Sequence, residues 1–306
     1  GLTLPWRPAT NPLGLAADVL PVESPTSTIR SVDGIDLHVV AAGREGDPVV
    51  VLLHGFPDCF YGWRHQIQPL VDAGYRVLVP DQRGYNLSDK PSGLDAYRLG
   101  RLSADIAALI ESEGEDSAHV VGHDWGAMVA WDLALRRPEH LDRLGILNVP
   151  HPSAFRSTLW SSPRQLLRSW YVFAFQLPRV PEWSLARNEF AGMKTALEET
   201  ANPATFDSLD LERYRKSWAE PGALTAMLNW YRAIARRPDI PSRKRVDAPT
   251  LIGWGEQDTA LVPELAEKSA RYCDDVRVEQ FPGRSHWVHV EAPEAVNDLL
   301  VEHLAG

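Results

Sequence analysis

The feature that most constrains the fold is a repeated alternation of short apolar runs with stretches of helical spacing. A run of this kind, three to five residues long and flanked by polar residues, is typical of a strand buried on both faces of a parallel sheet. The runs lie at 49–53, 75–79, 119–121 and 144–147, and apolar residues at helical spacing separate them at 63–71, 99–110 and 128–135. Strand–helix repetition of this length predicts an α/β fold with a mostly parallel, doubly wound sheet and right-handed crossovers.

Two departures from this alternation predict how the chain is divided. A hairpin at Asp33-Gly34 opens the sheet with antiparallel strands. After Pro150 the strand pattern stops, and helical stretches rich in Trp, Tyr, Phe and Arg continue to about Arg245. Strands then resume at 250–254 and 276–281, with a last helix from about Pro293. The predicted parts are a core at 1–149 and 246–306, which includes an irregular N-terminal arm at 1–25, and a helical cap inserted at 150–245.

Composition limits the partners and the compartment. The net charge is −10 and the one basic cluster is at 243–245, so nucleic acid and anionic membrane surfaces are poor candidates. Cys59 and Cys273 are too few and too far apart for a disulfide framework or a metal cage, which favours a reduced, cytoplasmic setting. No apolar run is long enough to span a membrane, and the first 25 residues lack the pattern of a signal peptide.

The motif Gly-His-Asp-Trp-Gly at 122–126 joins a predicted strand to a predicted helix. In a nucleophile elbow the central residue sits on a sharp turn that needs small neighbours, here Gly122 and Gly126. Asp124 holds the place where Ser is usual, and the N–H of Trp125 at the start of the helix can stabilise an oxyanion. Taken alone, the five residues are better explained as a chance turn in which Asp124 caps the helix, so the motif needs partners elsewhere in the chain.

A carboxylate that attacks carbon forms an ester, so a base and an orienting acid are needed to hydrolyse it. Asp258 and His286 each follow a later strand, in the chain order nucleophile, acid, base that this type of sheet uses. Asn148 ends the strand before the insertion but cannot balance an imidazolium, which leaves Asp258 as the acid. Two other histidines are rivals: His289, and His123, which the turn should aim away from the nucleophile.

The loop His-Gly-Phe-Pro at 54–57 follows another strand and should face the elbow. Phe56 can supply the second oxyanion N–H, and a tight turn predicts a cis bond between Phe56 and Pro57. We expect Phe56, Pro57 and Trp125 to contact the substrate.

Two cap helices each carry one tyrosine on an apolar stripe. A single Tyr in such a stripe is usually a core aromatic, but two phenols above an Asp nucleophile can donate protons to the oxygen of an epoxide. The stripes are Leu167, Trp170, Tyr171, Ala174 and Phe175 in the first helix, and Leu224, Met227, Leu228, Tyr231, Ile234 and Ala235 in the second. Other large cap residues are expected mainly to pack the cap, although they could line a pocket: Trp160, Trp183, Phe190, Met193 and Trp218.

From about Arg30 to the C-terminus, these motifs together resemble the epoxide hydrolases of the α/β-hydrolase fold, of the type without a membrane anchor or a phosphatase domain. The resemblance implies conversion of a small apolar epoxide and water to a vicinal diol, as in detoxification, by a monomer or homodimer without metal or organic cofactor. It implies these roles: Asp124 as nucleophile, His286 as base, Asp258 as its partner, Tyr171 and Tyr231 on the epoxide oxygen, and Phe56 and Trp125 as oxyanion donors.

Two other readings use the same scaffold. Haloalkane and fluoroacetate dehalogenases share the Asp nucleophile, but many haloalkane enzymes place a halide-binding Asn where this chain has Phe56, and a fluoroacetate enzyme would favour basic residues beside its nucleophile. A non-enzymatic receptor of this fold would bind a small apolar ligand, and the complete set of Asp124, Asp258 and His286 argues against it. A Ser esterase is excluded because no Gly-x-Ser-x-Gly motif occurs.

Overall fold

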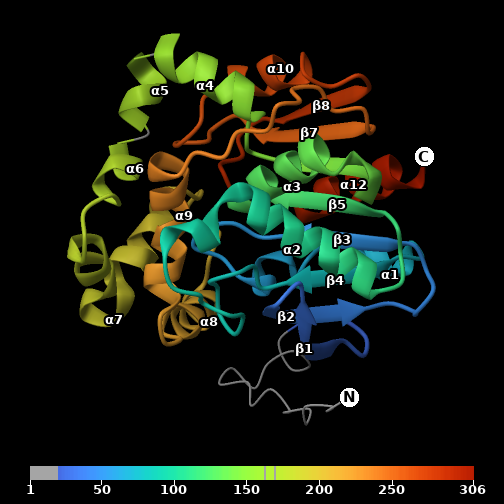
Figure 1. Cartoon of the computed structure of the whole chain (residues 1–306), viewed down its shortest axis with the longest axis horizontal. Coiled ribbons are helices and arrows are strands. Elements are labelled where there is room, and N and C mark those ends of the chain that lie inside the picture. The colour runs from blue at the N-terminus through green and yellow to red at the C-terminus, as the bar shows by residue number, and fades with distance from the viewer. Residues whose placement is uncertain (1–19, 162, 169) are drawn as a thin grey trace.

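The computed structural model describes residues 20–161, 163–168 and 170–306, so most of the expected N-terminal arm lies outside the described residues. Its core is a single eight-stranded sheet with helices packed against it (Figure 1), in the order β1-β2-β4-β3-β5-β6-β7-β8. The strands are β1 (Thr26–Val32), β2 (Ile35–Ala42), β3 (Val49–Leu53), β4 (Arg76–Pro80), β5 (Ala118–His123), β6 (Leu141–Leu147), β7 (Thr250–Gly255) and β8 (Val276–Phe281).

The sheet is antiparallel at its beginning and parallel elsewhere. Strand β1 pairs with β2, and β2 with β4, in antiparallel register. The remaining pairs, which are β4–β3, β3–β5, β5–β6, β6–β7 and β7–β8, are all parallel. Asp33 and Gly34 both have positive φ, 46° and 77°, as a two-residue hairpin turn requires. The predicted hairpin and the predicted mostly parallel sheet are therefore confirmed.

Helices cover the sheet as the strand–helix alternation predicts. Helix α2 packs on α3, which crosses β3, β5 and β6 on the side nearest the viewer in Figure 1, while α12 lies behind the sheet and packs on α1. The helices of this part are η1 (Phe60–Trp63), α1 (Ile67–Asp72), η2 (Leu94–Tyr97), α2 (Leu99–Ser112), α3 (Trp125–Arg136), η3 (Pro138–His140), α10 (Glu264–Ala270), α11 (Val288–Glu291) and α12 (Pro293–Ala305).

Between β6 and β7 the described residues form helices and turns and no named strand. These helices gather at one end of the sheet, on the left of Figure 1. Two indole N–H groups join them to core loops: Trp218 donates to the carbonyl of Pro57 at 2.6 Å, and Trp230 to that of Arg83 at 3.0 Å. The helices are α4 (Pro152–Ser161), α5 (Pro163–Arg168), α6 (Trp170–Ala174), α7 (Val180–Glu199, with non-helical backbone at 187–190), α8 (Ser208–Trp218) and α9 (Ala223–Arg236).

The two predicted apolar stripes are only partly buried. In the first, Tyr171 and Phe175 face the interior, but Leu167 and Trp170 are exposed, because one residue along a helix turns the side chain by about 100°. The second stripe is buried up to Tyr231, after which Ile234 and Ala235 are exposed. Trp230 and Ala233 are buried in their place.

The other large residues of the inserted segment divide in the same way. Met193 and Trp218 are buried in packing contacts and Phe190 is partly buried, whereas Trp183 is exposed. The side chain of Trp160 lies outside the described residues. Within the described part of the chain, no helix is both long and apolar enough to cross a membrane.

Candidate active site

The motif at 122–126 forms a sharp turn between β5 and α3. Asp124 has φ 50° and ψ −125°, a strained conformation for a residue with a side chain. A Cβ on Gly122 would lie 2.5 Å from a backbone oxygen of Gly126, and one on Gly126 would lie 2.1 Å from the carbonyl oxygen of Leu53. Asp124 occupies the N-cap position of α3, but its side chain makes no capping hydrogen bond. The alternative of a simple helix cap is therefore wrong, and the turn has the tightness of a nucleophile elbow.

The Asp124 carboxylate points into the space between the elbow and the 54–57 loop. Its Oδ1 accepts the N–H of Phe56 at 2.7 Å, and its Oδ2 lies 3.4 Å from Nε2 of His286. The peptide bond between Phe56 and Pro57 is cis, as predicted. Burial alone would raise the pKa of Asp124, but His286, His123 and the Phe56 N–H together hold it below its usual range. The carboxylate is therefore ionised at neutral pH, with 21% of the side chain accessible to solvent.

The structure brings Asp258 and His286 together beside Asp124. Nδ1 of His286 lies 2.7 Å from Oδ2 of Asp258, and the other Asp258 oxygen accepts the N–H groups of Ala260 and Leu261 at 2.8 and 2.9 Å. Burial raises the pKa of Asp258, but the charge and hydrogen bond of His286 lower it by more. Asp258 therefore stays ionised and fixes the orientation of the imidazole.

Two carboxylates face the ring of His286. Burial would lower the pKa of this histidine, but the charges and hydrogen bonds of Asp258 and Asp124 outweigh it and raise the pKa to about 10. At neutral pH, with both carboxylates ionised, His286 is an imidazolium.

Aromatic side chains from the inserted helices close the space above Asp124. The ring of Tyr231 lies 4.9 Å from that of Trp125, 5.3 Å from that of Phe56 and 6.0 Å from that of Tyr171. Burial and the negative charge of Asp124 raise the pKa of both tyrosines. Their hydroxyls consequently remain protonated at neutral pH and can serve as hydrogen-bond donors.

Asn148 was not expected to be the acid that partners the histidine, yet the structure places it in the site. Its Nδ2 donates to Oδ2 of Asp258 at 2.9 Å, and its Oδ1 accepts the N–H of Gly255 at 3.1 Å. Asn148 is fully buried with φ 52°. An amide cannot neutralise an imidazolium, but it can hold the carboxylate that does. Its position at the end of β6 was the signal for this role.

Glu291, at the end of α11, lies beside the site although the sequence did not predict a role for it. Its carboxylate accepts the N–H of Ser285 at 2.8 Å and the Ser285 hydroxyl, next to His286 in the chain. It also accepts the N–H and Nδ2 of Asn202, at 2.8 and 3.0 Å, and the hydroxyl of Thr205 at 3.2 Å. Glu291 thus ties the inserted segment to the loop that carries His286. No local sequence pattern marks this role.

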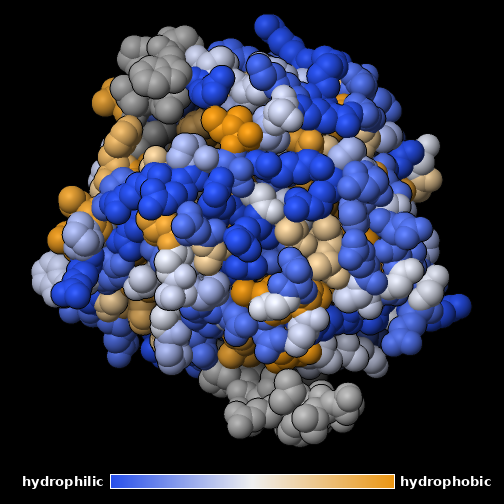
Figure 2. All heavy atoms as spheres, viewed as in Figure 1, coloured by the Kyte–Doolittle hydropathy of each residue, from blue (hydrophilic) through white to orange (hydrophobic). Residues whose placement is uncertain are grey.

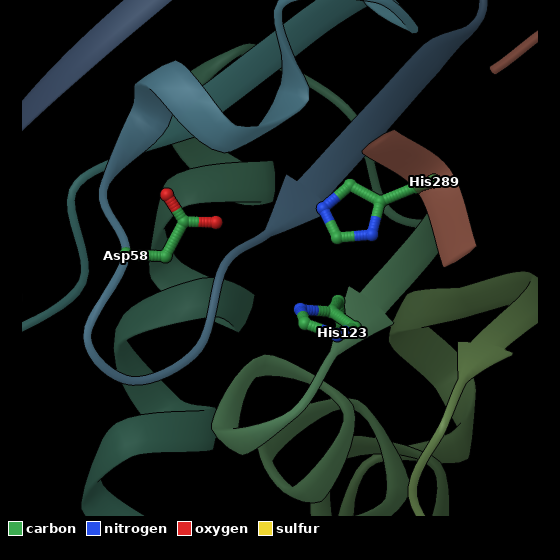
Figure 3. A group of neighbouring side chains, drawn as sticks. All are labelled: Asp58, His123 and His289. Atoms are coloured by element: carbon green, nitrogen blue, oxygen red, sulfur yellow. The ribbon is translucent and has the colours of Figure 1, made fainter. Parts of the chain in front are cut away.

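The two rival histidines lie behind His286 and form a buried group with Asp58 (Figure 3). Nε2 of His123 lies 2.8 Å from the carbonyl oxygen of His286, and the two rings are 4.7 Å apart. His123 therefore contacts the backbone of His286. Burial and the charge of His286 lower the pKa of His123 to about 3, so this histidine is neutral.

The same three side chains are the described residues that could hold a metal ion. Their ligand atoms lie within 4.8 Å of one another, and buried polar atoms on each have no hydrogen-bond partner. Ligands on a tetrahedral zinc ion are about 3.4 Å apart, whereas two partners of one hydrogen-bonded water are about 4.6 Å apart. Separations up to this limit suit a water that bridges two of the side chains, whereas a metal ion would need all three ligand atoms near the shorter spacing.

The fold and the elbow define an α/β hydrolase, and the family model described as alpha/beta hydrolase fold matches residues 48–293. The chain belongs to this family. Within the family it is closely related to epoxide hydrolases of bacteria and animals.

Three of the similar proteins are an AB hydrolase and two epoxide hydrolases. The AB hydrolase superfamily protein YfhM of Bacillus subtilis is 47% identical over 274 residues, which cover 90% of this chain and 96% of the relative. Epoxide hydrolase 4 of Mus musculus is 38% identical over 275 residues, which cover 87% of this chain and 76% of the relative. A crystal structure of Bacillus megaterium epoxide hydrolase with an inhibitor superposes with a TM-score of 0.84 at 32% identity, covering 91% of this chain and all of the other.

Proposed function

We propose that this protein is an epoxide hydrolase that adds water to small apolar epoxides through an ester of Asp124. The observation that supports this most directly is the position of an ionised carboxylate under two protonated phenols. The ionised carboxylate can attack a carbon atom, and the protonated phenols can donate a proton to the ether oxygen that leaves it. The epoxide hydrolases among its relatives support the same substrate class. In this proposal residues 150–245 form a cap over a core of 1–149 and 246–306.

In the first step Asp124 attacks one ring carbon, a C–O ester bond forms and the ring C–O bond breaks. The epoxide oxygen takes a proton from Tyr171 or Tyr231, and solvent later restores that proton to the phenol. The product of this step is a glycol ester of the enzyme.

Ester formation also prepares the base. Because the charge of Asp124 disappears in the ester, one of the two carboxylates that raise the pKa of His286 is lost, and this pKa falls. His286 then releases its proton to solvent and becomes able to accept one from water. The second step therefore becomes possible only after the first.

In the second step water loses a proton to His286 and attacks the ester carbonyl. The N–H groups of Phe56 and Trp125 hold the negative charge of the tetrahedral intermediate. When the intermediate collapses, the ester bond breaks and the diol oxygen takes the proton from His286. The carboxylic acid left on Asp124 then gives its proton to His286, which restores the carboxylate and the imidazolium of the free enzyme. The sum is epoxide plus water to vicinal diol, and neither a metal nor an organic cofactor takes part.

A single turnover in heavy-oxygen water tests the ester. The label should enter Asp124 and be absent from the first diol, whereas label in that diol would contradict the mechanism. The variant His286→Gln should accumulate a protein mass increase equal to that of the epoxide, because it can form the ester and cannot hydrolyse it.

The alternative of a dehalogenase rests on the same nucleophile, and the tyrosines distinguish the two. Replacing Tyr171 or Tyr231 by Phe should cost about 3 kcal/mol of transition-state stabilisation, by analogy with loss of one oxyanion donor. If both could be replaced without slowing ester formation, the epoxide assignment would be wrong. Incubation with styrene oxide and with a bromoalkane gives a direct comparison, since we expect diol and no halide.

A further inference from the structure

The segment from α5 to the start of α7 exposes six large apolar side chains within 17 residues, which we call the apolar face. Its members recur every three or four residues, each with 52% to 75% of its surface exposed: Leu167, Trp170, Phe173, Leu177, Val180 and Trp183. Figure 2 shows hydrophobic residues along the left edge of the molecule, over the region of α6 and the start of α7 in Figure 1, with hydrophilic residues between them.

The concentration of these side chains is what distinguishes the face. Six of the ten exposed large hydrophobic residues in the described part of the chain lie within 167–183. The other four are spread over β1, α8, α9 and the loop that follows it: Ile29, Leu209, Ile234 and Ile240. Single exposed apolar residues are ordinary, but a cluster of this kind marks a contact surface.

The rim of the apolar face is cationic, although the chain as a whole carries a net charge of −10. Arg179 and Arg187 are exposed, and the guanidinium of Arg187 lies 4.4 Å above the ring of Trp183. Arg236 is also exposed and donates to the main chain just before Leu177. The one acid within 167–183 is paired with an arginine of α9 by hydrogen bonds of 2.7 and 3.0 Å.

We propose that the apolar face binds the surface of an anionic phospholipid bilayer. Exposed Trp beside Leu, Phe and Val, with Arg at the edge, is the composition that lies in the headgroup region of a membrane. The net charge of −10 predicted that the chain would not bind anionic membranes, but that number is a sum over the whole chain and does not describe one patch of the surface. At 0.1 M salt, charges more than about 10 Å away are largely screened, so the local rim decides.

A second copy of the chain fits the face less well. A two-fold dimer brings the same patch of both subunits together, and the one acid within 167–183 is already paired, so neither subunit offers a free negative charge from this segment to the arginines of the other. Anionic headgroups instead supply the opposite charge.

The location gives the contact a use. Tyr171 and Phe175 of the same short segment pack against the core, with the ring of Phe175 5.9 Å from those of Phe56 and of Tyr171. A helix is about 10 Å across, so a bilayer on the apolar face would lie that far from the candidate active site. This use rests on the proposed function, whereas the binding does not.

The test is co-flotation of the whole protein with vesicles of phosphatidylcholine alone or with one third phosphatidylserine. We expect more protein to float with the anionic vesicles, and the difference to disappear at 0.5 M salt. The triple variant Phe173→Gln/Leu177→Gln/Val180→Gln should reduce the bound fraction about tenfold or more. The pair Arg179→Gln/Arg187→Gln should remove the preference for anionic vesicles.

A matched control removes the same number of exposed apolar residues outside the face, as Ile29→Gln/Leu209→Gln/Ile240→Gln, and should leave binding unchanged. Absence of wild-type binding to both kinds of vesicle would overturn the proposal. It would also be overturned by equal binding of the face and control variants, or by a wild-type dimer that the face variant converts to monomer. Hydrolysis of a water-soluble epoxide, measured separately, tests the proposed function without reference to lipid.

Discussion

Glu291 offers the sharpest test of how the inserted segment supports His286. Its two oxygens accept five hydrogen bonds, from Asn202, Thr205 and Ser285. In the variant Glu291→Gln an NH2 group replaces one oxygen. In place of Oε2 it faces two N–H donors, whereas in place of Oε1 it faces the Asn202 N–H and two hydroxyls, which can turn and accept from it. A bond to a charged acceptor contributes about 1.5 to 3 kcal/mol, and even the favoured placement loses the bond from the Asn202 N–H, so we expect a loss of about 1.5 to 3 kcal/mol. Because Glu291 is partly exposed, we expect the lower end of this range.

The kinetic effect should fall on one step. Ser285 precedes His286, so release of Ser285 shifts the base, and a shift of about 1 Å can cost about a hundredfold in rate. Formation of the ester at Asp124 should be little affected, while its hydrolysis slows and the ester accumulates. Rapid mixing with mass detection separates the two steps, and denaturant unfolding measures stability.

The variant Glu302→Gln is the matched control, because Glu302 is an exposed carboxylate that pairs with Arg277 far from the site. If Glu291→Gln changed unfolding and ester hydrolysis no more than this control, the tethering role would be refuted. Equal slowing of both steps would instead indicate a general loss of structure.

Four further predictions concern the elbow and its partners. The variant Asp124→Asn removes one of the charges that raise the pKa of His286 to about 10, so NMR titration of that histidine should give a lower pKa than in the wild type. In turnover, ester hydrolysis should slow at acidic pH, where His286 is protonated, while ester formation stays constant as long as the Asp124 carboxylate, whose pKa is depressed, is ionised. The variant Asn148→Ala removes a donor from Asp258 and leaves a buried N–H unpaired, which should lower the free energy of unfolding by about 2 to 4 kcal/mol in urea titrations. The variant Gly126→Ala places a methyl group 2.1 Å from a carbonyl oxygen of β3, so we expect loss of more than about 3 kcal/mol or failure to fold, as expression and circular dichroism would reveal.

The sequence alone determined the features that depend on neighbouring residues. Buried strands appeared as apolar runs, the hairpin as Asp33-Gly34, and the elbow as a small-x-Asp-x-small turn, because each is set by contacts within a few residues. Since parallel strands end at one edge of a sheet, the same reasoning predicted that Asp124, Asp258 and His286 would meet.

Only the tertiary structure decided what depends on distant packing. Asn148 could be seen at a strand end, but its bond to Asp258 depends on the distance between loops 110 residues apart. Glu291 collects donors from two loops, and no periodicity encodes such a convergence. The direction of Leu167 and Trp170 was also undetermined, because an apolar helix presents several faces and the packing of Tyr171 over the site selects which of them stays outside. Local sequence thus set the elements and their ends, and the long-range contacts between those elements set the details of the site and of the surface above it.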